Sequence, residues 1–78
     1  MEESKAYVLS RLEGFLKFKK ITKSDLAERW GKTEAYVYRR FSGEVELSLI
    51  DILELTNILQ IPKEEAKEIF FGRWLRNT

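Results

Sequence analysis

The chain has 78 residues, enough for one domain whose folding buries only about 60% of the surface of the unfolded chain. It contains neither Cys nor His, which excludes disulfides and thiolate metal sites and removes the commonest general base. It lacks the run of about 18 apolar residues that a membrane span needs, and its acidic N-terminus lacks a signal-peptide core. These features predict a cytoplasmic domain that is not an enzyme, with no cofactor, metal, membrane partner or small-molecule substrate.

The net charge of +1 is distributed unevenly along the chain. Residues 17–43 carry eight basic and three acidic side chains, a net charge of +5. Residues 44–71 carry two basic and seven acidic side chains, a net charge of −5. A basic segment of this kind is typical of a surface that binds a polyanion, but ordinary solvated charge gives the same count. Charge alone leaves both interpretations open.

Five helices are expected, since one Pro and four Gly leave little material for the turns of a sheet. The first is predicted over residues 4–19 from apolar residues at helical spacing, namely Val8, Leu12 and Phe15/Leu16. The second begins at Lys23, because Thr22 and Asp25 have the spacing of a capping box. Its buried stripe is predicted to be Leu26, Ala27 and Trp30. A left-handed Gly31 is expected to end it.

The remaining helices follow from similar signals. Thr33 is expected to cap a third helix that buries Val37 and Phe41 and ends at Gly43. Ser48 and Asp51 repeat the capping box and predict a fourth helix from Leu49 to about Leu59 or Gln60, with a core face of Ile52, Leu55, Ile58 and Leu59. Pro62 precedes a fifth helix from Lys63 to Phe71, which Gly72 is expected to close. Residues 1–72 thus form the domain and residues 73–78 a tail.

Only Gly31, Lys32 and Thr33 separate the second helix from the third. A turn this short, with Gly at its head, predicts the sharp crossing of a helix-turn-helix. The segment from Thr22 to Gly31, followed by Thr33, Val37 and Phe41-Ser42-Gly43, resembles the phage repressor and Cro-like helix-turn-helix family. The resemblance covers roughly residues 9–71. It implies a compact all-α, five-helix, lambda-repressor-like domain whose second and third helices form the DNA-binding motif.

The resemblance also implies which residues touch double-stranded DNA. The base-reading positions of the family correspond to Glu34, Ala35, Tyr38 and Arg39. The phosphate-contacting positions and neighbouring donors are Lys20, Lys23, Lys32, Thr33, Tyr36 and Arg40. Lys23 stands where the family usually has Gln, and a long cation still reaches a phosphate. Lys32 and Arg40 stand where the family usually has apolar residues, so Arg40 is expected to lay its aliphatic stem on the core.

The C-terminal part is rich in apolar side chains for a chain end, namely Phe70, Phe71, Trp74 and Leu75. Members of the family commonly form dimers near the fifth helix, so these residues are predicted to contact a second copy. Packing back onto the first helix is the alternative. A dimer would bind two DNA half-sites one helical turn apart.

Two functions are compatible with these patterns. The first is a sequence-specific transcriptional regulator, a repressor of the phage or mobile-element kind that occupies its operator. The second is a protein-interaction module on the same scaffold, an anti-repressor or modulator that binds another repressor protein. An acidic Glu34 on the third helix, two tyrosines and the low net charge favour the second.

Overall fold

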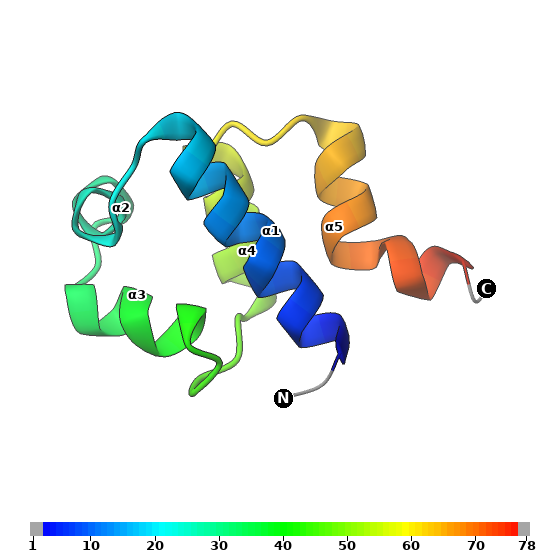
Figure 1. The fold of residues 1–78 in the computed structure, drawn as a ribbon, viewed down its shortest axis with the longest axis horizontal. Helices are drawn as coiled ribbons and strands as arrows, with labels where there is room; N and C mark the ends of the chain where they lie inside the picture. Colours follow the sequence, from blue (N-terminus) through cyan, green and yellow to red (C-terminus); the bar gives the residue numbers. More distant parts are fainter. Residues whose placement is uncertain (1–2, 77–78) are drawn as a thin grey trace.

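A computed structural model describes the backbone of residues 3–76 and the side chains of residues 5–72. This range contains no strand, and its helices are α1 (Glu3–Lys19), α2 (Lys23–Trp30), α3 (Glu34–Phe41), α4 (Leu49–Ile58) and α5 (Lys63–Arg76). α1 crosses in front of α4, with α2 and α3 on one side of this pair and α5 on the other (Figure 1). The predicted all-α class is confirmed. None of the described helices is both long enough and apolar enough to cross a membrane.

Capping boxes start α2 and α4, as the sequence predicts. The Thr22 hydroxyl accepts a hydrogen bond from the Asp25 amide at 3.0 Å, and the Asp25 carboxylate accepts one from the Thr22 amide at 3.1 Å. Ser48 and Asp51 repeat this exchange at 3.0 and 2.9 Å. Each box satisfies two amides that have no partner within the helix, so both helices begin at a defined residue.

The connection between α2 and α3 is only three residues long. These residues cap the C-terminal end of α2 and the N-terminal end of α3. Gly31 has a left-handed backbone with a φ of 71°, and its amide donates to the Glu28 carbonyl at 3.3 Å. The next amide, that of Lys32, donates to the Ala27 carbonyl at 3.0 Å. Thr33 then caps α3 by accepting a hydrogen bond from the Tyr36 amide at 3.1 Å. The two short helices pack directly against each other.

The hydrophobic core draws on every helix. Its buried members are Leu12 and Leu16 of α1, Leu26, Ala27 and Trp30 of α2, Val37 and Phe41 of α3, Leu55 of α4, Ile69 of α5, and Ile21, Leu59 and Ile61 from the connections. The stripes predicted for α2 and α3 are therefore confirmed. Of the core face predicted for α4, Leu55 and Leu59 are fully buried while Ile52 and Ile58 are half-buried.

The predicted end of α4 is one or two residues too late, and the predicted end of α5 is wrong. α4 ends at Ile58, and a turn with a left-handed Gln60 leads out of it. α5 continues through Gly72 to Arg76 instead of stopping at Phe71, so position 72 lies inside a helix. Gly72 does not take the left-handed conformation that ends a helix at glycine, and the four residues after it include no helix breaker.

Replacing Gly31 by Ala should lower the free energy of unfolding by about 1–2 kcal/mol, the cost of a left-handed backbone for an L-residue. An added Cβ would meet no atom within 4 Å, so the loss is conformational and not steric. Urea unfolding measures it. Gly14 is the matched control, since it also has open space around its Cβ but lies inside α1. Gly14→Ala should stabilise by up to about 1 kcal/mol, and equal effects at both positions would contradict this account.

Candidate nucleic-acid interface

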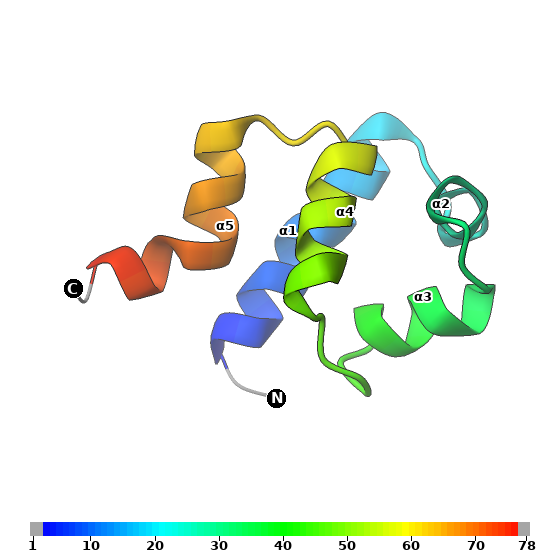
Figure 2. The same ribbon diagram turned by 180° about the vertical axis from the view of Figure 1, so that it is seen from behind.

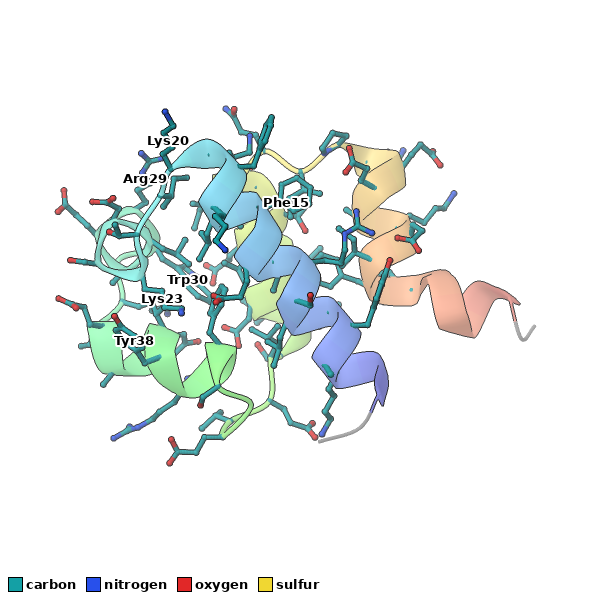
Figure 3. The ribbon with its side chains drawn as sticks, in the orientation of Figure 1. Phe15, Lys20, Lys23, Arg29, Trp30 and Tyr38 are labelled. Atoms are coloured by element: carbon teal, nitrogen blue, oxygen red, sulfur yellow. The ribbon has the colours of Figure 1, made fainter. Side chains whose placement is uncertain are left out.

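One side of α3 is buried in the core, and the other side faces solvent. Val37 and Phe41 are buried in the core. The four residues predicted to read bases are all exposed, namely Glu34, Ala35, Tyr38 and Arg39. Their spacing places them on one side of the helix, which we call the α3 face. Tyr38 projects from it into solvent with 52% of its surface exposed (Figure 3).

Lys23, the first residue of α2, lies at the edge of the α3 face. Its ammonium nitrogen lies 5.5 Å from the centre of the Tyr38 ring and 5.8 Å from that of Phe41. The same nitrogen forms a 3.1 Å ion pair with Glu13 of α1. Lys23 is therefore half-buried and already has partners, and a phosphate would compete with Glu13 for it.

Lys32 and Thr33 lie at the N-terminal end of α3, and both are exposed. The Lys32 ammonium lies 4.9 Å from the centre of the Tyr36 ring. The positive end of the α3 dipole points outward here, so this end attracts anions. Glu34 carries a negative charge that repels anions from this end of the helix. Its carboxylate accepts a hydrogen bond from the Ser24 hydroxyl at 3.4 Å.

The structure does not bring Lys20 to the α3 face. Lys20 lies in the turn between α1 and α2, where it is exposed and has a left-handed φ of 57°. Figure 3 shows Lys20 and Arg29 well apart from Tyr38 on α3. Lys20 therefore belongs to a different part of the surface from the residues at the N-terminal end of α3.

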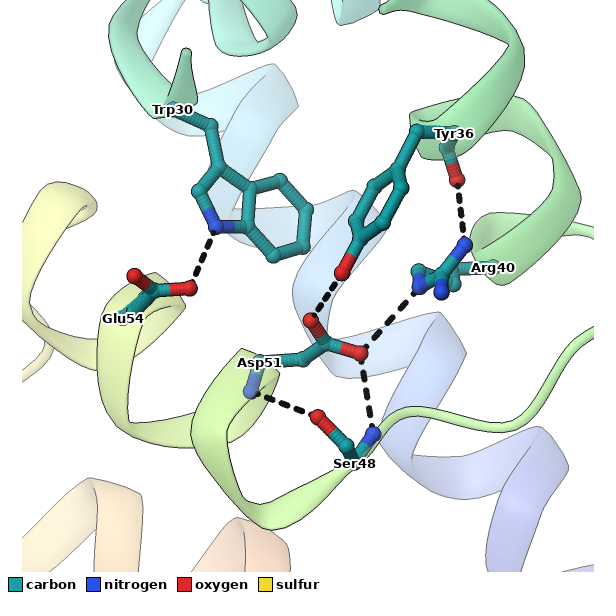
Figure 4. Close-up of polar contacts among 6 residues, drawn as sticks. All are labelled: Trp30, Tyr36, Arg40, Ser48, Asp51 and Glu54. Atoms are coloured by element: carbon teal, nitrogen blue, oxygen red, sulfur yellow. Dashed lines mark hydrogen bonds and ion pairs between the residues drawn. The ribbon is translucent and has the colours of Figure 1, made fainter. Parts of the chain in front are cut away.

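Tyr36 and Arg40 turn away from the α3 face and bind a buried carboxylate (Figure 4). Asp51 is only 2% exposed. Its two oxygens accept hydrogen bonds from the Tyr36 hydroxyl at 2.5 Å, from Nε of Arg40 at 3.1 Å and from the Ser48 amide at 2.9 Å. The Arg40 guanidinium also stacks 3.3 Å from the Tyr36 ring and donates to the Tyr36 carbonyl at 3.3 Å. We call Tyr36, Arg40, Ser48 and Asp51 the Asp51 cluster.

The charge state of Asp51 follows from this geometry. Burial acts to raise the pKa of the Asp51 carboxyl, but hydrogen bonds from Tyr36, Ser48 and Arg40 outweigh it and hold that pKa below its usual 3.8. The same hydrogen bond raises the pKa of the Tyr36 hydroxyl above its usual 10.0, with burial adding to the shift. Asp51 is therefore ionised at neutral pH, and the Tyr36 hydroxyl keeps its proton and donates a hydrogen bond to Asp51.

A second polar contact joins α2 to α4 beside this cluster. The Trp30 indole nitrogen donates to the Glu54 carboxylate at 3.1 Å, and the Trp30 ring meets the Tyr36 ring edge-on with centres 5.3 Å apart. The two contacts fix α2 and α3 against the same side of α4 (Figure 4). The orientation of the α3 face is thus set by polar groups as well as by the core.

Sequence reasoning missed Asp51 and Glu54 as partners of the motif. It assigned Asp51 only to the start of a helix, a role that normally leaves a carboxylate exposed. One signal was available, because Arg40 occupies a position where the resemblance led us to expect an apolar residue, and an inward cation requires a buried acid. Tyr36 and Arg40 also lie four residues apart, on the same side of α3.

Among the residues predicted to form a dimer contact, Phe70 and Phe71 differ in how far they are buried. Phe70 is half-buried and packs against the core, whereas Phe71 is 42% exposed. The side chains of Trp74 and Leu75 lie outside the described residues. α5 does pack on α1, where Arg11 forms ion pairs with Glu65 at 3.7 Å and Glu68 at 3.1 Å.

Comparison of the chain with family models, with curated proteins and with solved structures gave no match. The described residues form a small all-helical domain in which the exposed α3 face is held in place by an ion pair between half-buried Arg40 and buried Asp51.

Replacing Asp51 by Asn should lower the free energy of unfolding by up to about 3 kcal/mol, because it leaves the half-buried Arg40 charge without a counter-ion. Urea unfolding at about pH 7 measures this loss. The pKa of Asp51 is lower in the folded protein than in the unfolded chain, so its stabilisation is present above about pH 4 and disappears as the pH falls. The difference in unfolding free energy between the wild type and Asp51→Asn should therefore become smaller as the pH is lowered below about 4.

Asp25→Asn is the matched control, since Asp25 occupies the same capping-box position in α2 but is exposed. It should destabilise much less than Asp51→Asn at neutral pH. Equal losses at the two positions would show that Asp51 acts only as a helix cap.

Proposed function

We propose that this chain is a sequence-specific DNA-binding transcriptional regulator, a repressor of the phage or mobile-element kind. In this proposal α2 and α3 form the helix-turn-helix of a lambda-repressor-like domain, and α3 enters the major groove. The observation that carries the proposal is the α3 face, where four exposed side chains share one side of a helix whose other side is anchored in the core. A groove about 12 Å wide admits such a helix.

The chemistry of the α3 face suits base edges. The Arg39 guanidinium can donate to O6 and N7 of guanine together, a contact that discriminates by about 1–3 kcal/mol. The Ala35 methyl group can pack on the methyl group of thymine, and Glu34 can accept from N4 of cytosine. Tyr38 offers a hydroxyl donor and an aromatic ring beside them. These groups together distinguish one short base sequence from another.

Phosphate contacts come from a smaller set than the sequence predicts. Lys32, Thr33 and the first amides of α3 form one anion-binding end, and Lys23 lies beside it. Tyr36 and Arg40 are left out, since their polar atoms are engaged with Asp51. Lys20 would reach only DNA that extends past the α3 face. The proposed interface is therefore modest in charge, and its affinity should depend strongly on salt.

A protein-interaction module remains the second candidate, in which the α3 face binds another repressor protein. The observation in its favour is the small amount of unpaired positive charge near the α3 face. Arg40 is paired with Asp51, and Lys23 is paired with Glu13. Glu34 adds a negative charge that repels phosphates. DNA binding in low salt separates the two candidates. A module of this second kind would bind no duplex while forming a stable complex with its protein partner.

Selection of duplexes from a random pool should yield a defined preferred sequence for the wild type. Arg39→Ala should relax the preference at one base pair and weaken binding to the preferred site by about 1–3 kcal/mol. Arg29→Ala is the control, because it removes another exposed cation, one that lies away from Tyr38 (Figure 3). An unchanged preferred sequence in Arg39→Ala would refute the role given to Arg39.

Lys32→Ala should weaken binding to all duplexes to a similar extent, because a phosphate contact carries no base information. The slope of the logarithm of the binding constant against the logarithm of salt concentration should fall by about 1. Titrations at several salt concentrations measure both quantities. A loss confined to the preferred sequence would mean that Lys32 contacts a base.

A further inference from the structure

A pocket lies between α1, α4, α5 and the connection from α3 to α4, which spans residues 42–48. Figure 2 shows that connection at the same end of the molecule as the start of α1. The pocket is open to solvent and has a volume of about 210 Å³. None of the four residues of the α3 face lines it, so it is separate from the proposed DNA contact.

Most of the pocket wall is apolar. Its apolar members come from three helices and from the connection, and all of them are half-buried, namely Val8, Leu9, Val45, Leu47, Ile52 and Phe70. These side chains leave apolar surface in contact with water around one hollow. Covering that surface with an apolar group is favourable, because it releases the water.

The charged residues described in the wall are Lys5, Arg40 and Glu46. Lys5 and Glu46 form an ion pair with each other, so their charges offset. The Arg40 guanidinium donates through Nε to Asp51 and through Nη1 to the Tyr36 carbonyl. In the described part of the chain, Nη2 of Arg40 has no hydrogen-bond partner. The pocket therefore contains a cationic group with a donor to spare.

Asp51 does not occupy this guanidinium completely. The Asp51 oxygens also accept hydrogen bonds from the Tyr36 hydroxyl and the Ser48 amide, so Arg40 is not their sole donor. A guanidinium carries more N–H groups than these contacts use, and it binds carboxylates through charge-assisted hydrogen bonds. Arg40 can therefore hold Asp51 and bind a second carboxylate from the pocket.

We propose that this pocket binds a small monocarboxylate with an apolar body. The carboxylate accepts hydrogen bonds from the Arg40 guanidinium, and the apolar body packs on the six half-buried side chains. An apolar cavity of about 150 Å³ holds benzene, so the larger volume here fits a ring with a short acidic arm. A neutral apolar ligand would take the Nη2 donor out of water without pairing it, which costs free energy.

The ligand would bind the same side chain that orients α3. Arg40 joins α3 to Asp51 at the start of α4, so a carboxylate on its remaining donors should change the surroundings of α3 as well as those of the pocket. The site itself does not depend on the proposed function, since it is measured without DNA.

Titration of the full chain with phenylacetate, followed through the amide signals in NMR spectra, tests the proposal. The signals of Val45, Leu47 and Tyr36 should shift and reach a plateau. The uncharged 2-phenylacetamide has nearly the same shape but no charge to pair with Arg40, so it should bind at least about tenfold more weakly. Shifts that do not saturate, or equal affinities for the two compounds, would overturn the proposal.

Two variants separate the parts of the site. Val45→Phe should fill the pocket and cause the loss of saturable binding for both compounds. The paired change Arg40→Gln with Asp51→Asn removes both charges together, so neither is left without its partner. It should remove the preference for phenylacetate over 2-phenylacetamide, and a preference that persists would refute the role of Arg40. Circular dichroism of each variant verifies that the helices are intact.

Leu53→Phe is the matched control, because it enlarges an apolar side chain of α4 that is 61% exposed and does not line the pocket. It should leave both affinities unchanged. If Leu53→Phe weakened binding as much as Val45→Phe, the location given to the site would be wrong.

Discussion

The buried Asp51 carboxylate determines how α3 is held against the rest of the molecule. Removing a charge from water costs several kcal/mol unless donors surround it, and here Tyr36, Arg40 and Ser48 supply them. Such a group tolerates few alternative arrangements, because any shift of α3 would leave a donor or an acceptor unpaired. The apolar contacts of Val37 and Phe41 keep α3 on the core, and the polar contacts select one orientation of it.

This arrangement also reduces the positive charge that the basic segment, residues 17–43, presents to solvent. The count of cations between residues 17 and 43 suggests a strongly positive surface, but position decides how much of that charge reaches solvent. Arg40 neutralises Asp51 inside the molecule, and Lys23 is paired with Glu13 on a neighbouring helix. On and beside the α3 face, Lys32 and Arg39 remain exposed together with the Glu34 carboxylate. We therefore expect recognition to rely on specific contacts more than on bulk attraction.

Local signals predicted most of the fold. The capping pairs Thr22/Asp25 and Ser48/Asp51 and the left-handed Gly31 act within a few residues, so their effect is visible in the sequence itself. The residues of the α3 face were expected only from the resemblance to the helix-turn-helix family, and all four are exposed. The partners of Asp51 could not be found this way, because Tyr36 and Arg40 approach it only once α3 packs on α4. The true end of α5 was missed because a glycine is a stop signal only when its backbone turns left-handed.

The division of α3 into two sides bears on how such a domain diversifies. Ala35, Tyr38 and Arg39 are exposed and take no part in the core, so their replacement should alter stability by less than about 0.5 kcal/mol. A lineage carrying this scaffold can thus explore new binding specificities at those positions without first acquiring compensating mutations elsewhere. Tyr36 and Arg40 are next to these residues in the chain, but they cannot be replaced as freely, because both bind Asp51.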